Sequence, residues 1–217
     1  MSRIASRIAL AISGCRIDIE GLAQLPRQGP LVLVTNHTSY ADTPVLVAAL
    51  PIDFVIVAMT EILRWPLIGT FSRRGEHPLV DRWHLSQSLA DAATIERRLR
   101  EGEAILFFVE GGFSRASGLR PFRLGAFEAA VATGAAVVPI ALRGTRRLLP
   151  ADTHMPRPGP VHVWIGESLR AVGTGWKAAV ELRDRAADAV AQHCGELRRD
   201  GIVRPDVNGP VSGRRLE

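Results

Sequence analysis

The 217-residue chain is poor in several residue types that define whole classes of protein. It has two cysteines, Cys15 and Cys194, which form neither a disulfide framework nor a metal-binding motif and which favour a reducing compartment. Aromatic residues make up only 6% of the chain and do not accompany the basic residues in a pattern typical of nucleic-acid binding. We therefore expect no metal and no nucleic-acid partner.

Lysine and long apolar runs are also scarce. No stretch of about 20 apolar residues occurs, so we expect no transmembrane segment. Lys177 is the only lysine, yet 27 basic against 22 acidic residues give a net charge of +5. A positive surface suits anionic lipid headgroups and other phosphates. Hydrophobic residues form 47% of the chain, which is enough for the core of one domain.

Residues 1–14 are predicted to form a short amphipathic helix. Ile4, Ile8, Ala11 and Ile12 share one helical face, while Leu10 falls outside it, so the helix is only weakly amphipathic. Arg3 and Arg7 lie one turn apart beside that face. The helix is too short to span a bilayer, and two interpretations stay open: it lies in a membrane interface, or it packs on the domain.

The rest of the chain alternates between strand-like and helix-like segments. Strands are predicted at 16–20, 31–34, 54–58, 104–109, 135–142 and 161–166, and helices at 42–50, 83–101, 125–132 and 176–199. Strand–helix–strand units with short links predict parallel neighbours. We expect one α/β domain over 15–199 with a mixed, mostly parallel sheet flanked by helices, and a flexible tail at 200–217.

A polar stretch between two apolar segments is the strongest candidate site. His37 follows the predicted strand 31–34, and Asp42 opens the predicted helix 42–50. A nearby carboxylate can fix the tautomer of a histidine and stabilise its protonated form, so His37 can act as a general base. The alternative is that His37 is a core histidine and Asp42 only an N-cap. Ligands of such folds bind outside the carboxyl ends of strands, which is where His37 stands.

Polar groups follow two later strand-like segments. The run 79–82 ends in Arg82, and a guanidinium makes bidentate bonds to phosphate. The strand 104–109 leads into a glycine turn that can bring backbone amides close to an anion. Its polar and glycine residues are Glu110, Gly111, Gly112, Ser114 and Arg115. Farther on, Pro139 predicts a strand end or bulge near the site, because a central strand disfavours proline.

In this order, the stretches resemble the motif blocks of the glycerolipid acyltransferase superfamily, which includes the lysophosphatidic acid and glycerol-3-phosphate acyltransferases. Residues 36–42 are similar to its NHxSxxD block, and 79–82 to the block whose arginine binds the acceptor phosphate. Residues 107–115 resemble the F-P-E-G-T-R-S block, and Pro139 belongs to a segment similar to its V-x-P block. An apolar segment at 61–69 also resembles the family, as core or as the wall of an acyl channel.

The resemblance implies acyl transfer from an acyl-CoA or acyl carrier protein thioester to a hydroxyl of a glycerophosphate-type acceptor, most simply 1-acylglycerol-3-phosphate, without a cofactor. It implies His37 as general base and Asp42 as its orienter. The implied substrate-binding residues are Arg82, Glu110, Gly111, Gly112, Ser114, Arg115 and Pro139. Backbone amides near the His37 or Gly111 turns are expected to stabilise the oxyanion. The implied location is cytoplasmic, peripherally on the inner face of the membrane.

Departures from the family pattern leave the acceptor open. Gly112 and Phe113 stand where the third block usually has threonine and arginine, so Arg115 or Arg123 would carry more of a phosphate site. Glycerol-3-phosphate or another lyso-lipid is the alternative acceptor.

Two alternatives come from other classes of protein. A thioesterase or lipase would use Ser39 or Ser114, although neither lies in a Gly-x-Ser-x-Gly elbow. A catalytically inactive lipid-binding protein is the other, prompted by the altered third block.

Overall fold

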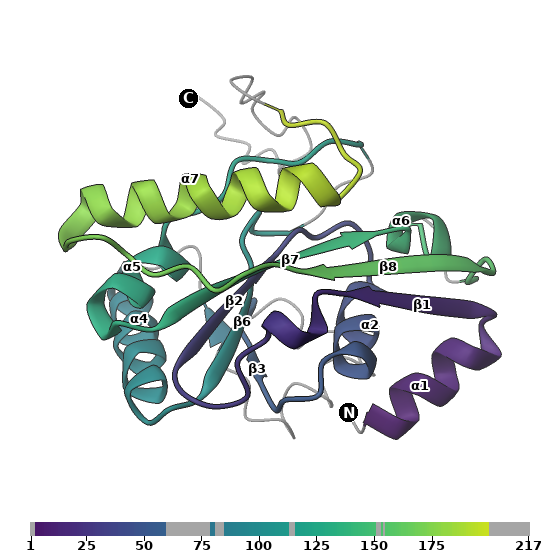
Figure 1. Ribbon diagram of the computed structural model, residues 1–217, viewed down its shortest axis with the longest axis horizontal. Helices are drawn as coiled ribbons and strands as arrows, with labels where there is room; N and C mark the ends of the chain where they lie inside the picture. Colours follow the sequence, from purple (N-terminus) through teal and green to yellow (C-terminus); the bar gives the residue numbers. More distant parts are fainter. Residues whose placement is uncertain are drawn as a thin grey trace, which may run out of the picture.

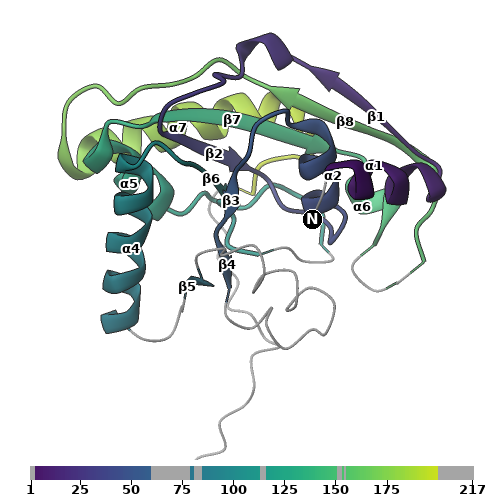
Figure 2. The ribbon, with the colours of Figure 1, turned by 90° about the horizontal axis from the view of Figure 1, so that it is seen from below.

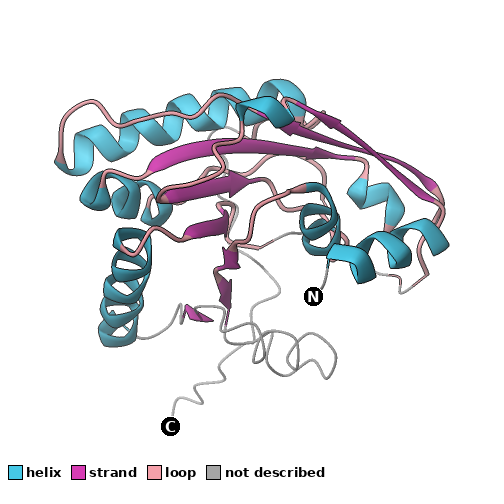
Figure 3. Cartoon of the chain, turned by 60° about the horizontal axis from the view of Figure 1, so that its bottom comes forward, coloured by secondary structure: helices cyan, strands magenta, loops and turns pink. Residues whose placement is uncertain are grey.

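The computed structural model describes residues 3–59, 79–80, 85–112, 116–150, 153 and 155–199. Within them, six strands form one sheet in the order β1-β8-β7-β2-β6-β3. Figure 3 shows the strands in magenta, with helices in cyan packed around them. Their bounds are β1 Cys15–Glu20, β2 Leu31–Thr35, β3 Val55–Ile56, β6 Ala104–Phe108, β7 Ala136–Arg143 and β8 Gly159–Ile165. Two further short strands, β4 Ala58–Met59 and β5 Leu79–Val80, pair with each other in parallel.

The sheet is mixed and mostly parallel, as the sequence predicts. Strands β3, β6, β2 and β7 run parallel to one another, while β8 is antiparallel to β7 and β1 is parallel to β8. The predicted adjacency of the strands at 31–34 and 54–58 is wrong, because β6 lies between β2 and β3. All five residues of β2 are buried, so this strand sits inside the sheet and pairs on both edges, with β6 and β7.

Helices cover both faces of the sheet (Figures 1 and 2). Their bounds are α1 Arg3–Ile12, α2 Asp42–Ala49, α4 Leu85–Arg100, α5 Gly125–Thr133, α6 Thr145–Leu148 and α7 Gly175–His193, with a 3₁₀ turn at Leu22–Gln24. Leu31 and Leu33 of β2 join a core with α1, α2 and α6, whereas Val32 and Val34 join a second core with α4, α5 and α7. Alternating side chains of one buried strand thus supply both cores.

Helix α1 packs on α2 through the face that the sequence pattern does not favour. Ser6 and Leu10 are its buried residues. The isoleucines of the predicted apolar face point outward, with Ile4 70%, Ile8 55% and Ile12 83% exposed. The domain therefore does not use the isoleucine face of α1.

One predicted helix is shorter than expected, and one short helix was not predicted. The prediction of a helix over 176–199 is wrong beyond His193, because Gly195 turns the chain in the left-handed region at φ 71°. The loop after β7 contains α6, which the sequence analysis missed because four residues are too short for a periodic pattern.

Candidate active site

Two polar loops meet at the carboxyl edge of the sheet. Strands β2 and β6 are parallel neighbours with Thr35 opposite Phe108, so the residues that follow each strand emerge side by side. Thr35 leads into His37, and Phe108 leads into Glu110. The amide of Val109 donates to the Thr35 carbonyl at 3.3 Å. The structure thus brings together two of the stretches that the sequence analysis selected.

His37 and Asp42 form the predicted pair. The distance from His37 Nδ1 to Asp42 Oδ2 is 2.8 Å, and the Asp42 side chain is fully buried whereas that of His37 is 14% exposed. The same Asp42 oxygen accepts the amides of Thr38 at 2.7 Å and Ser39 at 2.9 Å. An oxygen held by two backbone donors fixes the Nδ1–H tautomer, so Nε2 is the nitrogen that can take a proton.

Phe108 supports the histidine ring from one face. The two ring centroids lie 3.9 Å apart with an interplanar angle of 23°. Stacking and the bond to Asp42 together leave the ring little freedom to rotate. No local sequence pattern predicts this contact; it follows from the register that places the last residue of β6 beside the last residue of β2.

The loop that carries His37 is anchored to the end of β7 and to the segment that follows it. The Asn36 side chain donates to the Leu142 carbonyl at 2.9 Å and accepts the Leu142 amide at 2.8 Å, so it replaces a strand residue in the ladder. Thr38 Oγ1 lies 2.9 Å from Thr145 Oγ1. Ser39 Oγ donates to the Leu149 carbonyl at 2.6 Å. These partners are more than 100 residues away in the chain, and no local pattern could reveal them.

Glu110 joins the two loops through the backbone. Its Oε1 accepts the His37 amide at 2.8 Å and its Oε2 accepts the Arg120 amide at 2.9 Å. Burial raises the pKa of the Glu110 carboxyl above its usual value, against the two backbone hydrogen bonds that lower it. Glu110 is only 6% exposed, so these contacts assign it a bridging role, and its predicted contact with substrate stays a prediction.

Two arginines lie against the glycine turn. Arg120 donates through Nη2 to the Gly112 carbonyl. The guanidinium of Arg123 fills the space that a Cβ at Gly111 would need, and Gly111 has a φ of 72° that L side chains rarely adopt. Arg123, one of the residues predicted to bind phosphate, thus stands at the predicted turn, and its side chain is exposed.

Pro139 lies inside β7, so its prediction as a strand end is wrong. It is buried opposite Val34 of β2. β7 pairs with β8 only from Ile140 onward, so a residue without an amide hydrogen breaks no β7–β8 ladder bond. The other predicted site residues, Arg82, Ser114 and Arg115, lie outside the described residues, as does the segment 61–69.

Four of the amides near the two turns expected to stabilise an oxyanion are used within the protein. His37 donates to Glu110, Thr38 and Ser39 donate to Asp42, and Gly111 donates to the Phe108 carbonyl at 2.9 Å. These four donors fix the shape of the two loops. Any oxyanion contact from this edge therefore comes from other groups.

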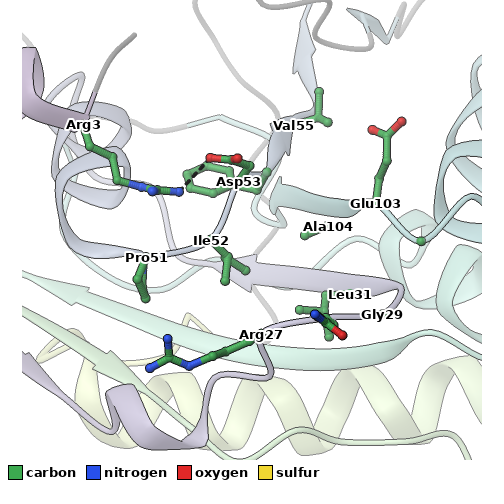
Figure 4. A pocket seen from close by; sticks show the side chains of 13 residues that line it. Arg3, Arg27, Gly29, Leu31, Pro51, Ile52, Asp53, Val55, Glu103 and Ala104 are labelled. Atoms are coloured by element: carbon green, nitrogen blue, oxygen red, sulfur yellow. Dashed lines mark hydrogen bonds and ion pairs between the residues drawn. The ribbon is translucent and has the colours of Figure 1, made fainter.

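The structure also contains a cavity of about 660 Å³ at the opposite edge of the sheet (Figure 4). It is lined by Leu31, Val55 and Ala104, which are the first residues of β2, β3 and β6. Across its rim Arg3 pairs with Asp53 at 2.7 Å. The cavity is separate from the His37 pair, which lies at the carboxyl ends of the same strands.

The described part of the chain contains neither a metal-binding cluster nor a membrane-spanning helix. No group of three or more His, Cys, Asp or Glu residues in it is placed to hold a metal ion. None of its helices combines the length and apolar character needed to cross a membrane.

Fold and site together define an α/β protein with an acid–base pair at the carboxyl edge of its sheet. The model of a protein family described as Acyltransferase matches residues 16–143. The chain therefore belongs to the acyltransferase family.

Individual relatives agree with this assignment. A chloroplastic 1-acyl-sn-glycerol-3-phosphate acyltransferase of Arabidopsis thaliana is 39% identical over 181 residues, covering 81% of this chain and 49% of that protein. A lyso-ornithine lipid O-acyltransferase of Brucella abortus is 33% identical over 147 residues, covering 64% of this chain and 54% of that protein. The chain thus spans about half the length of these curated relatives.

The fold also matches a solved structure, the 1-acyl-sn-glycerophosphate acyltransferase from Thermotoga maritima. The TM-score is 0.74 at 22% sequence identity, and the match covers 88% of this chain and 75% of that chain. At this identity the match supports the α/β architecture described above.

Proposed function

We propose that the chain catalyses transfer of a fatty acyl group from a thioester to a hydroxyl of a lyso-glycerophospholipid, with 1-acylglycerol-3-phosphate as the first candidate acceptor. The observation that carries this proposal is the 2.8 Å contact between His37 Nδ1 and Asp42 Oδ2 at the carboxyl edge of the sheet, within an acyltransferase family member. The thioester is an acyl-CoA or an acyl carrier protein derivative.

The proposed reaction proceeds by direct transfer. His37 Nε2 removes the hydroxyl proton while the hydroxyl oxygen attacks the thioester carbonyl carbon. The new C–O bond forms, the C–S bond breaks, and the leaving thiolate takes the proton back from the imidazolium. Asp42 stabilises the transient charge on the ring, since its Oδ2 faces Nδ1.

The acceptor headgroup would lie against the basic turn after β6. The exposed guanidinium of Arg123 stands at Gly111, next to the Glu110 bridge to His37. A guanidinium can bind phosphate oxygens through bidentate, charge-assisted hydrogen bonds. Arg82 and Arg115 are proposed as further phosphate ligands, and for Arg82→Ala we expect a larger rise in acceptor KM than in thioester KM.

A second acceptor class is favoured by one sequence substitution and by the name of one relative. Phe113 replaces the arginine of the third motif block, and a relative with 33% identity is named a lyso-ornithine lipid O-acyltransferase. An ornithine headgroup carries an amine and a carboxylate in place of a phosphate, so it needs fewer arginines. Lyso-ornithine lipid therefore belongs in any acceptor panel, together with glycerol-3-phosphate.

The proposed location is the cytoplasmic, inner face of the membrane, with peripheral attachment. The exposed isoleucines of α1, which are Ile4, Ile8 and Ile12, provide an apolar face of the kind that lies in a bilayer interface. The positive net charge of the chain favours an anionic surface.

The test is thiol release from acyl-CoA and acyl carrier protein thioesters, measured against 1-acylglycerol-3-phosphate, lyso-ornithine lipid and glycerol-3-phosphate. For His37→Ala we expect a loss of turnover of roughly 10² to 10⁴-fold with the fold retained, because the general base is gone. Near wild-type transfer by this variant would refute the assignment. Vesicle binding by the wild type without thioester consumption would favour the inactive lipid-binding alternative.

The thioesterase alternative is disfavoured by the environment of Ser39. Its hydroxyl is fully buried, donates to the Leu149 carbonyl and accepts the Ala41 amide at 3.0 Å. A nucleophile would need to be accessible and bonded to a base. Direct transfer leaves no acyl-enzyme, so trapping of a covalent acyl group would overturn the proposed mechanism.

A further inference from the structure

A short segment after α7 lies against the loop that follows the glycine turn. We name Gly195–Arg199 the C-terminal clamp. The Leu119 amide donates to the Leu197 carbonyl at 2.9 Å, and the Arg199 amide donates to the Leu119 carbonyl at 2.8 Å. Leu119 itself is 4% exposed and belongs to the core beneath α5 and α7. The clamp thus holds the loop by its backbone, as a neighbouring strand would.

Glu196 is the charged centre of the clamp. Its Oε1 accepts Nε of Arg146 at 2.8 Å, and its Oε2 accepts Nη2 of Arg146 at 3.0 Å. The Gly118 amide also donates to Oε2. The Glu196 side chain is 15% exposed, so this is a bidentate, charge-assisted pair with limited access to water. One carboxylate therefore ties α6, which contains Arg146, to the loop.

The connection continues from the loop to the catalytic histidine. Gly118 is two residues before Arg120, whose amide donates to Glu110 at 2.9 Å. The other oxygen of Glu110 accepts the amide of His37 at 2.8 Å. A hydrogen-bonded chain thus runs from Arg146 through Glu196, the loop and Glu110 to the backbone of His37.

We propose that Glu196 is a positioning residue for acyl transfer, acting through the loop 116–120 on Glu110 and His37. This inference rests on the proposed function. The family match covers residues 16–143, and both Glu196 and Arg146 lie beyond it. The clamp therefore lies outside the segment that the family model matches.

Loss of the clamp should act mainly on the acceptor. The loop connects the glycine turn at Gly111 with Arg123, which are the groups proposed to face the acceptor headgroup. A displacement of about 1 Å in positioning groups costs up to 10²-fold in rate. For Glu196→Ala we expect kcat/KM for the acceptor to fall about 10-fold or more, with thioester KM within about twofold of wild type.

The variants are chosen so that stability and positioning separate. Glu196→Gln keeps an acceptor for the Gly118 amide but removes the charge, and Glu196→Asp keeps the charge on a shorter arm. The matched control is Asp188→Asn, which removes the carboxylate partner of Arg198 in the same segment without touching the loop. We expect Asp188→Asn to match wild type and Glu196→Asp to recover part of the activity. In an Arg146→Met background, Glu196→Ala should cause a smaller loss than in wild type, because only the Gly118 contact is left to remove.

The kinetic outcomes decide the question if the enzyme is active. Lower thermal stability of Glu196→Ala with unchanged kcat and unchanged KM for both substrates would show a purely structural role and overturn the proposal. Equal effects on both KM values would also overturn it.

Amide hydrogen exchange tests positioning without any substrate. In Glu196→Gln and Glu196→Ala, the amides of His37 and Arg120 should exchange faster than in wild type and in Asp188→Asn. Unchanged exchange at both amides overturns the proposal even if the enzyme is active. Faster exchange in a protein that consumes no thioester supports positioning and counts only against the proposed function.

Discussion

One oxygen of the Asp42 carboxylate contacts both the turn after β2 and the ring of His37. Oδ2 receives His37 Nδ1 and the amides of Thr38 and Ser39. The carboxylate also stands in the first turn of α2, where the helix dipole favours negative charge. Local spacing predicted the pair, because both residues lie within six positions of each other. The two amide bonds could not be predicted, since they depend on how the turn folds.

Asp42→Asn tests the orienting role of this oxygen. An NH₂ group facing Nδ1 would oppose the Thr38 and Ser39 amides and move the ring proton to Nε2, whereas an amide oxygen in that place carries no charge to stabilise the protonated ring. We therefore expect turnover to fall by about 10² to 10⁴-fold while the fold is retained. Initial rates, combined with circular dichroism and a thermal melt, check this expectation. Turnover close to wild type in a folded variant would contradict the role assigned to Asp42.

Glu110→Gln tests the bridge between the two loops. The wild-type carboxylate accepts two backbone amides, whereas a glutamine presents its NH₂ group to one of them. An unsatisfied buried donor costs about 1–3 kcal/mol, so the free energy of unfolding should fall by that amount at neutral pH.

The same variant has a pH signature. Burial raises the folded-state pKa of Glu110 above its ordinary value of 4.5. At pH values between the unfolded-state and folded-state pKa of Glu110, the folded protein binds more protons than the unfolded chain. The protonated carboxyl therefore contributes fully to stability below the unfolded-state pKa. This contribution is lost as pH rises through the folded-state pKa. Urea unfolding at several pH values should show wild-type stability minus variant stability falling as pH rises from about 4.5. A difference that rises with pH over this range would be inconsistent with the raised pKa.

At the scale of helices and strands, apolar periodicity predicted most elements, because each element buries one face. β2, β6, β7, α2 and α5 lie at or within two residues of their predicted bounds. The order of the strands could not be predicted from periodicity. β6 lies between β2 and β3, and this position depends on pairing between residues far apart in the chain. α6 and the end of α7 depend on left-handed glycines at 144 and 195, whose conformation no periodic pattern reports.

Helix α1 shows a different limit of the sequence pattern. Ser6 and Leu10 contact the domain, and Arg3 and Arg7 donate to carbonyls at the end of α2, at 3.0 Å to Leu50 and 3.0 Å to Ala48. Cations at a helix carboxyl end are favourable, which explains why the polar side packs inward. The pattern identified the amphipathic helix and left open which face the domain would use.

Replacing Ile4, Ile8 and Ile12 by serine tests the membrane role of α1. Burial of one isoleucine contributes on the order of 1.5 kcal/mol or more, so vesicle binding should weaken at least about 10-fold. The three side chains are exposed, and we expect the thermal midpoint to change little.

The matched control for this test removes exposed apolar groups elsewhere. Val172 and Trp176 are 77% and 67% exposed near the start of α7, and their replacement by serine should leave vesicle binding unchanged. Equal losses in the two variants, measured by co-sedimentation, would show that α1 has no special part in attachment.

The whole chain carries more positive than negative charge. A net charge of +5 predicts attraction to anionic bilayers that is screened by salt. Raising NaCl from about 0.1 to 1 M shortens the Debye length from about 10 to 3 Å, so binding to vesicles rich in phosphatidylglycerol should weaken. Binding to purely zwitterionic vesicles should change little. Salt-independent binding to both kinds of vesicle would leave the apolar face of α1 as the main cause.

The anchoring of the His37 loop has a consequence for chimaeric enzymes. Two of its supports, Thr145 and the carbonyl of Leu149, stand after the segment that the family model matches, which ends at residue 143. A graft of 16–143 into a related scaffold would transplant the acid–base pair but leave those supports to the recipient. Exchanges meant to transfer activity should therefore extend through residue 149.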